Sequence, residues 1–185
     1  MELGLVTEGI TEIIAVTKDN AAPIGIILRP GKLPSMILFK GSKTEENIRT
    51  YGWVTANFVS DSYLYAEYAF NDVKVEDLAV DGTCQYLKAA DAYIRYTATV
   101  VHETEQTYLV ELSPDGAEVI LHPGIRRVSR GFDAVIDATV HATRYIRTPT
   151  QELADRIAYD FGLIRKCGGP REQQAAELLR SVCRL

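Results

Sequence analysis

Hydrophobic and polar residues alternate with a period of two through the first part of the chain, and this pattern predicts β-strands. Turn-forming Gly, Pro, Asn and Asp residues separate the apolar segments. We expect strands at residues 10–17, 24–28, 36–39, 54–59, 92–102, 107–113 and 119–121. About six or seven strands of this kind are enough to close a small β-barrel.

Two short helices are expected among these strands. Thr44 has the side chain of a helix N-cap, and the two glutamates that follow it suit the positive end of a helix dipole. Gly52 is suited to end this first helix. Residues 61–70 fit a second helix capped by Asp61, although their apolar spacing also fits an alternating strand.

From residue 130 onward the apolar residues recur at helical spacing. The stripe that predicts a helix over residues 130–147 consists of Val135, Thr139, Ala142 and Ile146. This change of period divides the chain into a barrel domain, residues 1–128, and a helical C-terminal extension packed on the barrel, residues 129–185.

Two further helices are expected in the extension. The first begins in the segment Thr148-Pro149-Thr150-Gln151, with Thr148 as the N-cap and Pro149 in the first turn. Gly168 and Gly169 stop this helix, and Pro170 opens the last one. The predicted architecture is therefore a β-barrel followed by helices.

Composition and charge narrow the classes of function. The 185 residues carry a formal net charge of −5 at pH 7, which argues against a nucleic-acid partner. No apolar segment reaches the ~18 residues that a membrane span needs, and the first residues lack the basic region of a signal peptide. The three cysteines and three histidines lack metal-site spacing. We therefore expect a cytoplasmic protein with free thiols, no membrane partner and no metal.

One segment of small residues is a candidate ligand contact. Small side chains let a flat ring lie against the main chain, so that backbone N–H and C=O groups reach its edge. The segment joins two expected strands, and it consists of Asn20, Ala21, Ala22, Pro23, Ile24 and Gly25. The same residue types also fit a tight strand connection with no ligand.

A second candidate segment precedes the first expected helix. The start of a helix gathers unpaired N–H donors, which makes it a natural anion site. Lys43 adds a positive charge there, and Ser42 and Thr44 add hydroxyl groups. The spacing of a Walker loop is missing. Taken alone, these residues favour a capped surface helix without a ligand.

Six motifs, taken in order, carry a resemblance to a known family. They are Asn20-Ala21-Ala22-Pro23-x-Gly25, Lys43-Thr44-x-x-Asn47-Ile48, Thr55-Ala56-Asn57-Phe58-Val59, Arg130-Gly131-Phe132-Asp133-Ala134-Val135-Ile136, His141-Ala142-Thr143-Arg144 and Cys167-Gly168-Gly169-Pro170. In this order and spacing the motifs resemble the flavin-reductase-like branch of the FMN-binding split-barrel superfamily. The resemblance is nearest to a largely archaeal family of unknown function that is proposed to bind FMN.

The resemblance implies a mainly β fold of the α+β class, a Greek-key flavin-reductase-like split β-barrel. It implies a homodimer with one FMN at each of two symmetric sites near the subunit interface. The segment from Asn20 to Gly25 then lines the isoalloxazine ring. Lys43 and Thr44 hold the phosphate, with Ser42 nearby and Asn47 bracing the turn. Asn57 is implied as a further contact to the ring or the ribityl chain.

The function that follows from the resemblance is FMN binding, with a flavin-dependent oxidoreductase of unknown substrate and electron donor as its enzymatic form. The long helical extension and the missing nicotinamide signature depart from typical flavin reductases. Two other functions stay open: a non-catalytic module that stores or delivers FMN, and a split barrel that binds another phosphorylated aromatic ligand.

Overall fold

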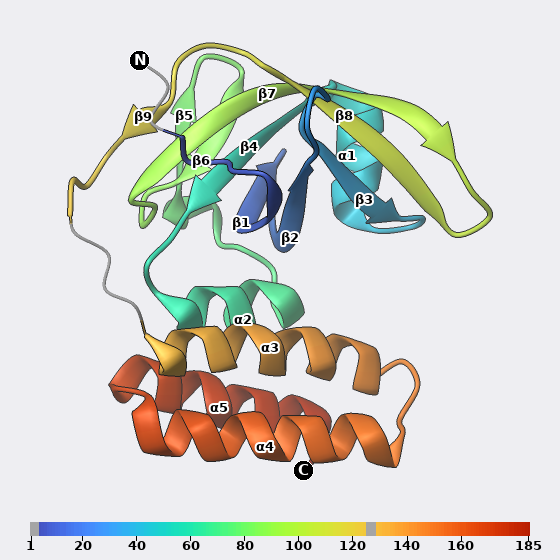
Figure 1. The fold of residues 1–185 in the computed structure, drawn as a ribbon. Coiled ribbons are helices and arrows are strands. Elements are labelled where there is room, and N and C mark those ends of the chain that lie inside the picture. Colours follow the sequence, from blue (N-terminus) through green and yellow to red (C-terminus); the bar gives the residue numbers. More distant parts are fainter. Residues whose placement is uncertain (1–3, 125–128) are drawn as a thin grey trace. The chain divides into compact units, whose positions relative to one another are not determined.

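The computed structural model describes residues 4–124 and 129–185, and within them the chain divides into two compact units (Figure 1). The first unit holds the residues up to Val59 and Asp72–Gly124. The second holds Ser60–Asn71 and the described residues from Ser129 onward. The boundary expected between residues 128 and 129 stays a prediction. Ser60–Asn71 lies between two strands of the barrel in the sequence, but it belongs to the same compact unit as the C-terminal helices.

The first unit is a closed antiparallel β-barrel. Its strands are β1 (Gly9–Thr17), β2 (Asn20–Leu28), β3 (Ser35–Phe39), β4 (Trp53–Phe58), β7 (Ala92–Glu103) and β8 (Thr107–Pro114). The order is β4-β1-β2-β3-β8-β7, and the pairing of β4 with β7 closes the ring. Because β4 returns beside β1 after three consecutive strands, this is the expected Greek key.

Three short strands lie outside the ring. β5 (Leu78–Asp81) and β6 (Cys84–Leu87) form a separate hairpin after a short 3₁₀ helix (Val75–Asp77), and β9 (Val119–Ile120) pairs with β7. The sequence pattern did not predict the β5–β6 hairpin, because each of its strands has only four residues, too few for a clear alternation. All the strands expected from the pattern are present.

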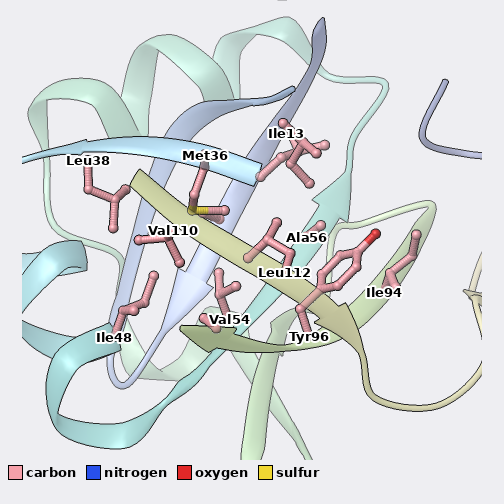
Figure 2. Close-up of a cluster of buried hydrophobic side chains, with 13 residues drawn as sticks. Ile13, Met36, Leu38, Ile48, Val54, Ala56, Ile94, Tyr96, Val110 and Leu112 are labelled. Carbon is pink, nitrogen blue, oxygen red and sulfur yellow. The ribbon is translucent and has the colours of Figure 1, made fainter. Parts of the chain in front are cut away.

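The barrel encloses one hydrophobic core (Figure 2). Alternate residues of the strands point inward, and α1 (Lys43–Tyr51) adds Ile48 to them. The labelled core residues are Ile13, Met36, Leu38, Ile48, Val54, Ala56, Ile94, Tyr96, Val110 and Leu112. Burial of these side chains is the main force that holds the ring closed.

The start of α1 differs from the prediction by two residues. Ser42, not Thr44, is the N-cap, and its Oγ accepts a hydrogen bond from the backbone N–H of Glu45 at 3.3 Å. Gly52 ends the helix as expected, because its φ of 71° is left-handed and its N–H reaches Ile48 O at 2.8 Å. The Thr44 side chain therefore does not cap the helix and lies inside its first turn.

The second unit is made of helices, namely α2 (Ser62–Phe70), α3 (Arg130–Tyr145), α4 (Gln151–Cys167) and α5 (Pro170–Cys183). Asp61 caps α2, so the alternative of a strand there is wrong. Thr150 caps α4 in place of the predicted Thr148. Gly168 ends α4 and Pro170 begins α5, as expected. No helix in the described part of the chain is long and apolar enough to cross a membrane.

Small residues set the packing of this helical unit. Its core is rich in alanine, with Ala66, Ala134, Ala138, Ala142, Ala175 and Ala176 all buried. At Gly131 a Cβ atom would lie 2.6 Å from Gly168 Cα, so the start of α3 and the end of α4 approach backbone to backbone. Short side chains therefore allow these helices to pack at close range.

Candidate functional site

A tight turn joins β1 to β2 and positions the first candidate segment. Thr17 pairs with Asn20, so that Lys18 and Asp19 form the turn, with Asp19 at a φ of 48°. Gln85 of β6 braces Asp19 twice: its Oε1 accepts from Asp19 N at 2.7 Å and its Nε2 donates to Asp19 Oδ1 at 2.8 Å. Hydrogen bonds from Lys18 and Gln85 lower the pKa of Asp19.

The segment from Asn20 to Gly25 is the first part of β2 rather than a connection between strands. The segment is therefore not a connection between two strands, and this prediction is wrong both with and without a bound ligand. The strand begins early because each residue from Asn20 to Leu28 pairs with β1. Small side chains and a proline concealed this strand in the sequence, since neither is typical of strands.

One edge of this part of β2 is open. β2 pairs with β1 along its length, but with β3 only where Ile27 meets Ser35. Among the described residues, no strand pairs with the other edge of β2 from Asn20 to Ile26. This is the split in the barrel, and it leaves a row of main-chain groups without a partner strand.

The register shows which main-chain groups face the open edge. Pro23 has no N–H, so its pair with Ile14 is a non-hydrogen-bonded one. Ile14 O accordingly accepts from Asn57 Nδ2 at 3.1 Å, on the side away from β2. By alternation, Ala21 and Gly25 share the orientation of Pro23. The open edge therefore offers both N–H donors and C=O acceptors to the rim of a flat polar ring.

The start of α1 supplies a group of donors. The backbone N–H groups of Lys43 and Thr44 have no acceptor among the described residues, as is usual in a first helical turn. Lys43 Nζ lies 3.4 Å from Asp72 Oδ1, and both side chains are exposed. The buried Glu45 carboxylate is occupied by the N–H of Gly41 at 3.1 Å and by Arg49 at 3.1 Å.

Two side-chain amides, one buried and one partly buried, connect the two candidate segments. Asn20 Nδ2 donates to Thr44 Oγ1 at 3.0 Å and to Thr17 Oγ1 at 3.3 Å. Asn47 Nδ2 donates to Thr17 Oγ1 at 3.0 Å and to Lys18 O at 2.8 Å. The start of β2 and the start of α1 are therefore one structural site, with Asn47 bracing the β1–β2 turn.

Asn57 has a visible structural role. It is fully buried, and its Nδ2 donates to Ile14 O and to Thr55 O, the latter at 2.9 Å. Its Oδ1 accepts from Leu87 N at 2.8 Å, which fastens β6 to β4. Both amide hydrogens are thus engaged within the barrel, and a contact to a ligand stays a prediction.

Sequence reasoning missed two residues of this site. Thr17 accepts from both amides, and Gln85 holds the turn from a hairpin far along the chain. Thr17 stands next to a turn-forming pair, which is a weak local signal. Gln85 has no local signal, because its partner is 66 residues away.

A closed Greek-key barrel with an open strand edge beside a donor-rich helix start defines the class of this protein. It is a flavin-reductase-like split barrel with an added helical part. The structure of the flavin reductase HpaC complexed with NADP+ shares the fold at a TM-score of 0.50 and 13% identity, covering 64% of this chain and 83% of that one.

The particular family follows from closer matches. A family model described as "Protein of unknown function (DUF447) N-terminal domain" matches residues 11–120, and a second, "Protein of unknown function (DUF447)", matches residues 129–181. The chain belongs to this family. An FMN-bound member from Methanosarcina mazei is 35% identical, with a TM-score of 0.89, covering 96% of this chain and 97% of that one.

Proposed function

We propose that this protein binds FMN at the split of its barrel. The observation that carries the proposal is the 35% identity, over 96% of the chain, to the FMN-bound protein from Methanosarcina mazei. Bound FMN supplies redox chemistry in one- or two-electron steps, while the protein supplies orientation and electrostatics.

The residues present fit the two ends of FMN. The phosphate matches the start of α1, where Lys43 and the N–H groups of Lys43 and Thr44 are all donors. The isoalloxazine rim carries both acceptors and an N–H donor, and the open edge of β2 offers main-chain partners of both kinds. Ala21 and Ala22 carry only a methyl group each in this part of β2, whereas the space beside Gly25 is filled by the Ile10 side chain.

We propose an electron- or hydride-transferring role with a small-molecule substrate, and we keep a second candidate, an FMN carrier. The carrier is favoured by one observation: Asn20–Gly25 holds no cationic side chain to stabilise a reduced, anionic ring. The free state of Cys84, Cys167 and Cys183 supports placing the protein in the cytoplasm, where thiols stay reduced.

We further propose that the protein is a homodimer. The outward faces of β1 and β3 carry Ile10, Ile37 and Phe39, which are 62%, 49% and 54% exposed. Burial of such a face is favourable, and a second copy beside the open edge of β2 gives the ring a second wall. A symmetric pair uses the same face on both copies.

Sedimentation of two lysine variants tests the dimer. Wild type is expected at twice the mass of one chain, and Ile37→Lys at the mass of one, because a charge in an apolar interface is costly. Val80→Lys is the matched control, since Val80 is 70% exposed on the β5–β6 hairpin. A monomeric wild type, or equal effects of both variants, contradicts an interface on this face.

Cofactor analysis tests the FMN proposal. The purified protein, reconstituted with FMN and freed of excess, is expected to retain about one FMN per chain, with riboflavin bound more weakly because it lacks the phosphate. Isothermal titration of both flavins measures the difference. A preparation that retains neither flavin overturns the proposal and favours another phosphorylated aromatic ligand.

A further inference from the structure

Two threonine hydroxyls lie in the amide network between β2 and α1, and both belong to buried residues. Thr17 is 0% exposed and Thr44 is 4% exposed. An amide nitrogen only donates hydrogen bonds, so each hydroxyl oxygen that faces one must accept. The direction of every hydrogen bond in this network is therefore set by the orientation of the two asparagine amides.

The orientation of Asn47 is fixed by its surroundings. Its Nδ2 lies 2.8 Å from Lys18 O, a carbonyl that only accepts, and the same nitrogen donates to Thr17 Oγ1. Thr17 Oγ1 also accepts from Asn20 Nδ2, so Thr17 is held as a double acceptor. In the structure the amide nitrogen of Asn20, and not its oxygen, faces both threonine hydroxyls.

Asn20 carries the effect on to α1. Its other amide hydrogen goes to Thr44 Oγ1 at 3.0 Å, so the Thr44 hydroxyl accepts from Asn20 and its own hydrogen points elsewhere. That hydrogen has no acceptor among the described residues. Thr44 is therefore a buried donor in the same helical turn as the unpaired N–H groups of Lys43 and Thr44.

We propose that Asn20 is a positioning residue that holds the Thr44 hydroxyl as an obligatory donor, so that the start of α1 selects a fully ionised phosphate monoester. The N–H groups of Lys43 and Thr44 and the Thr44 hydroxyl are then all donors, and a phosphate group without hydrogens can accept from each of them. A monoanionic phosphate or an alcohol presents a hydrogen where an acceptor is needed. The inference rests on the proposed FMN function and deepens it.

The test combines ³¹P NMR titration of bound FMN with calorimetry of FMN and riboflavin. A free phosphate monoester has a second pKa of about 6, and we expect bound FMN to titrate below it. Asn20→Asp replaces the donor with an acceptor, turns the Thr44 hydrogen inward and adds a negative charge. This variant should raise the bound phosphate pKa and weaken FMN about tenfold or more, a larger loss than that of riboflavin.

Two substitutions at Thr44 carry the test if Asn20→Asp does not fold. Thr44→Val removes the hydroxyl at nearly constant shape and should raise the bound phosphate pKa and weaken FMN, again sparing riboflavin. Thr44→Ser restores the donor and should restore both quantities. Circular dichroism establishes that each variant is folded.

The outcomes separate the two proposals. If the wild type retains no FMN, the proposed function fails. If the wild type binds FMN but the folded variants weaken both flavins equally, or leave the phosphate pKa unchanged, the network only holds the hairpin in place and the positioning role of Asn20 is overturned.

Discussion

At the scale of single residues, amides and hydroxyls rather than charges connect the barrel to its first helix. Asn20, Asn47 and Thr17 are tied by hydrogen bonds of 3.0–3.3 Å. Buried polar groups of this kind are costly when unpaired, so each contact also fixes the geometry of its neighbours. Charged residues such as Lys43 lie at the rim of the same site, where solvent weakens their pairing.

The role of Lys43 gives the first prediction. Lys43→Ala should weaken FMN by ~10–100-fold, because a hydrogen bond to a charged group contributes about 1.5–3 kcal/mol. Riboflavin affinity should stay nearly constant. Asp72→Asn is the matched variant with the opposite expected effect. It removes the exposed ion-pair partner of Lys43 and should increase FMN affinity slightly. Calorimetric titration measures all four affinities, and an equal loss for both flavins would remove Lys43 from the phosphate site.

A second prediction concerns Asp160, which pairs with His141 at 3.0 Å inside the helical unit. Burial raises the pKa of Asp160 above its usual value, despite the opposing effect of His141. Because the pKa of Asp160 is higher in the folded than in the unfolded state, the free energy of unfolding of wild type decreases as pH rises from the unfolded pKa through the folded pKa. Asp160→Asn does not titrate and keeps an acceptor for His141.

The variant should therefore be at least as stable as wild type at pH 7. The difference in free energy of unfolding between the variant and wild type should shrink as pH falls and vanish below about pH 4, the ordinary pKa of aspartate. Urea unfolding of both proteins between pH 3.5 and about 8 measures this difference. A variant that loses more stability the higher the pH would show that the carboxylate is net stabilising.

At the scale of elements, β2 and α3 are both shaped by residues that are poor formers of their own structure. Pro23 lacks an N–H at the open edge of β2, and edges are where proteins tolerate proline in a sheet. It also hinders pairing by a foreign strand, so the edge stays open to a ligand. In α3, Gly131 serves packing, because it allows the helix to meet α4 closely.

Two glycine-to-alanine variants should have opposite effects on the helical unit. Gly131→Ala places a Cβ 2.6 Å from Gly168 Cα, a backbone atom that cannot move alone, and overpacking of this kind costs about 1–3 kcal/mol. Gly162→Ala, inside α4, meets nothing within 4 Å and should stabilise the helix by up to ~1 kcal/mol. Thermal unfolding followed by circular dichroism gives both signs. Matching shifts in melting temperature would contradict the close approach.

At the scale of the whole molecule, the barrel and the helical unit are built by different rules. Long-range strand pairing closes the first, whereas helix caps and alanine-rich contacts hold the second. All the residues that we assign to FMN lie in the barrel unit. Under the proposed function, the barrel sets the redox potential of the bound flavin, because the open edge of β2 would bring main-chain dipoles rather than side-chain charges to the ring.

This arrangement gives the last prediction, which separates an enzyme from a carrier. A potential shifts only when the oxidised and reduced flavins are bound differently. With no cationic side chain in Asn20–Gly25, we expect a potential near that of free FMN and slow or no reduction by NAD(P)H. Dithionite should reduce the bound flavin readily and serves as the control. In anaerobic stopped-flow mixing, bleaching by NADH or NADPH at ~1–1,000 per second, the usual range of turnover, would instead indicate a nicotinamide-using reductase.

Local sequence patterns were enough to predict the six barrel strands, β9 and the helices α1 to α5 in order, but not the β5–β6 hairpin. Alternation identified the strands of the barrel, and Asp61, Gly52 and Pro170 marked helix ends, because periodicity and caps act between residues close in the chain. The ordered motifs also led to the right family. Local signals chose the wrong residue where two candidates competed, such as Ser42 and Thr44 for the cap of α1, and they missed the start of β2.

Tertiary structure alone decided what the candidate residues do. The open edge of β2 exists because β3 pairs with it only at Ile27. The sequence of β2 does not indicate where this pairing ends. Thr44 is not the N-cap of α1, and its hydroxyl instead accepts a hydrogen bond from Asn20, 24 residues earlier. Ser60–Asn71 joined the C-terminal helices through contacts far along the chain. Such outcomes depend on which distant surfaces meet, and a single strand or helix does not encode its partner in its own pattern.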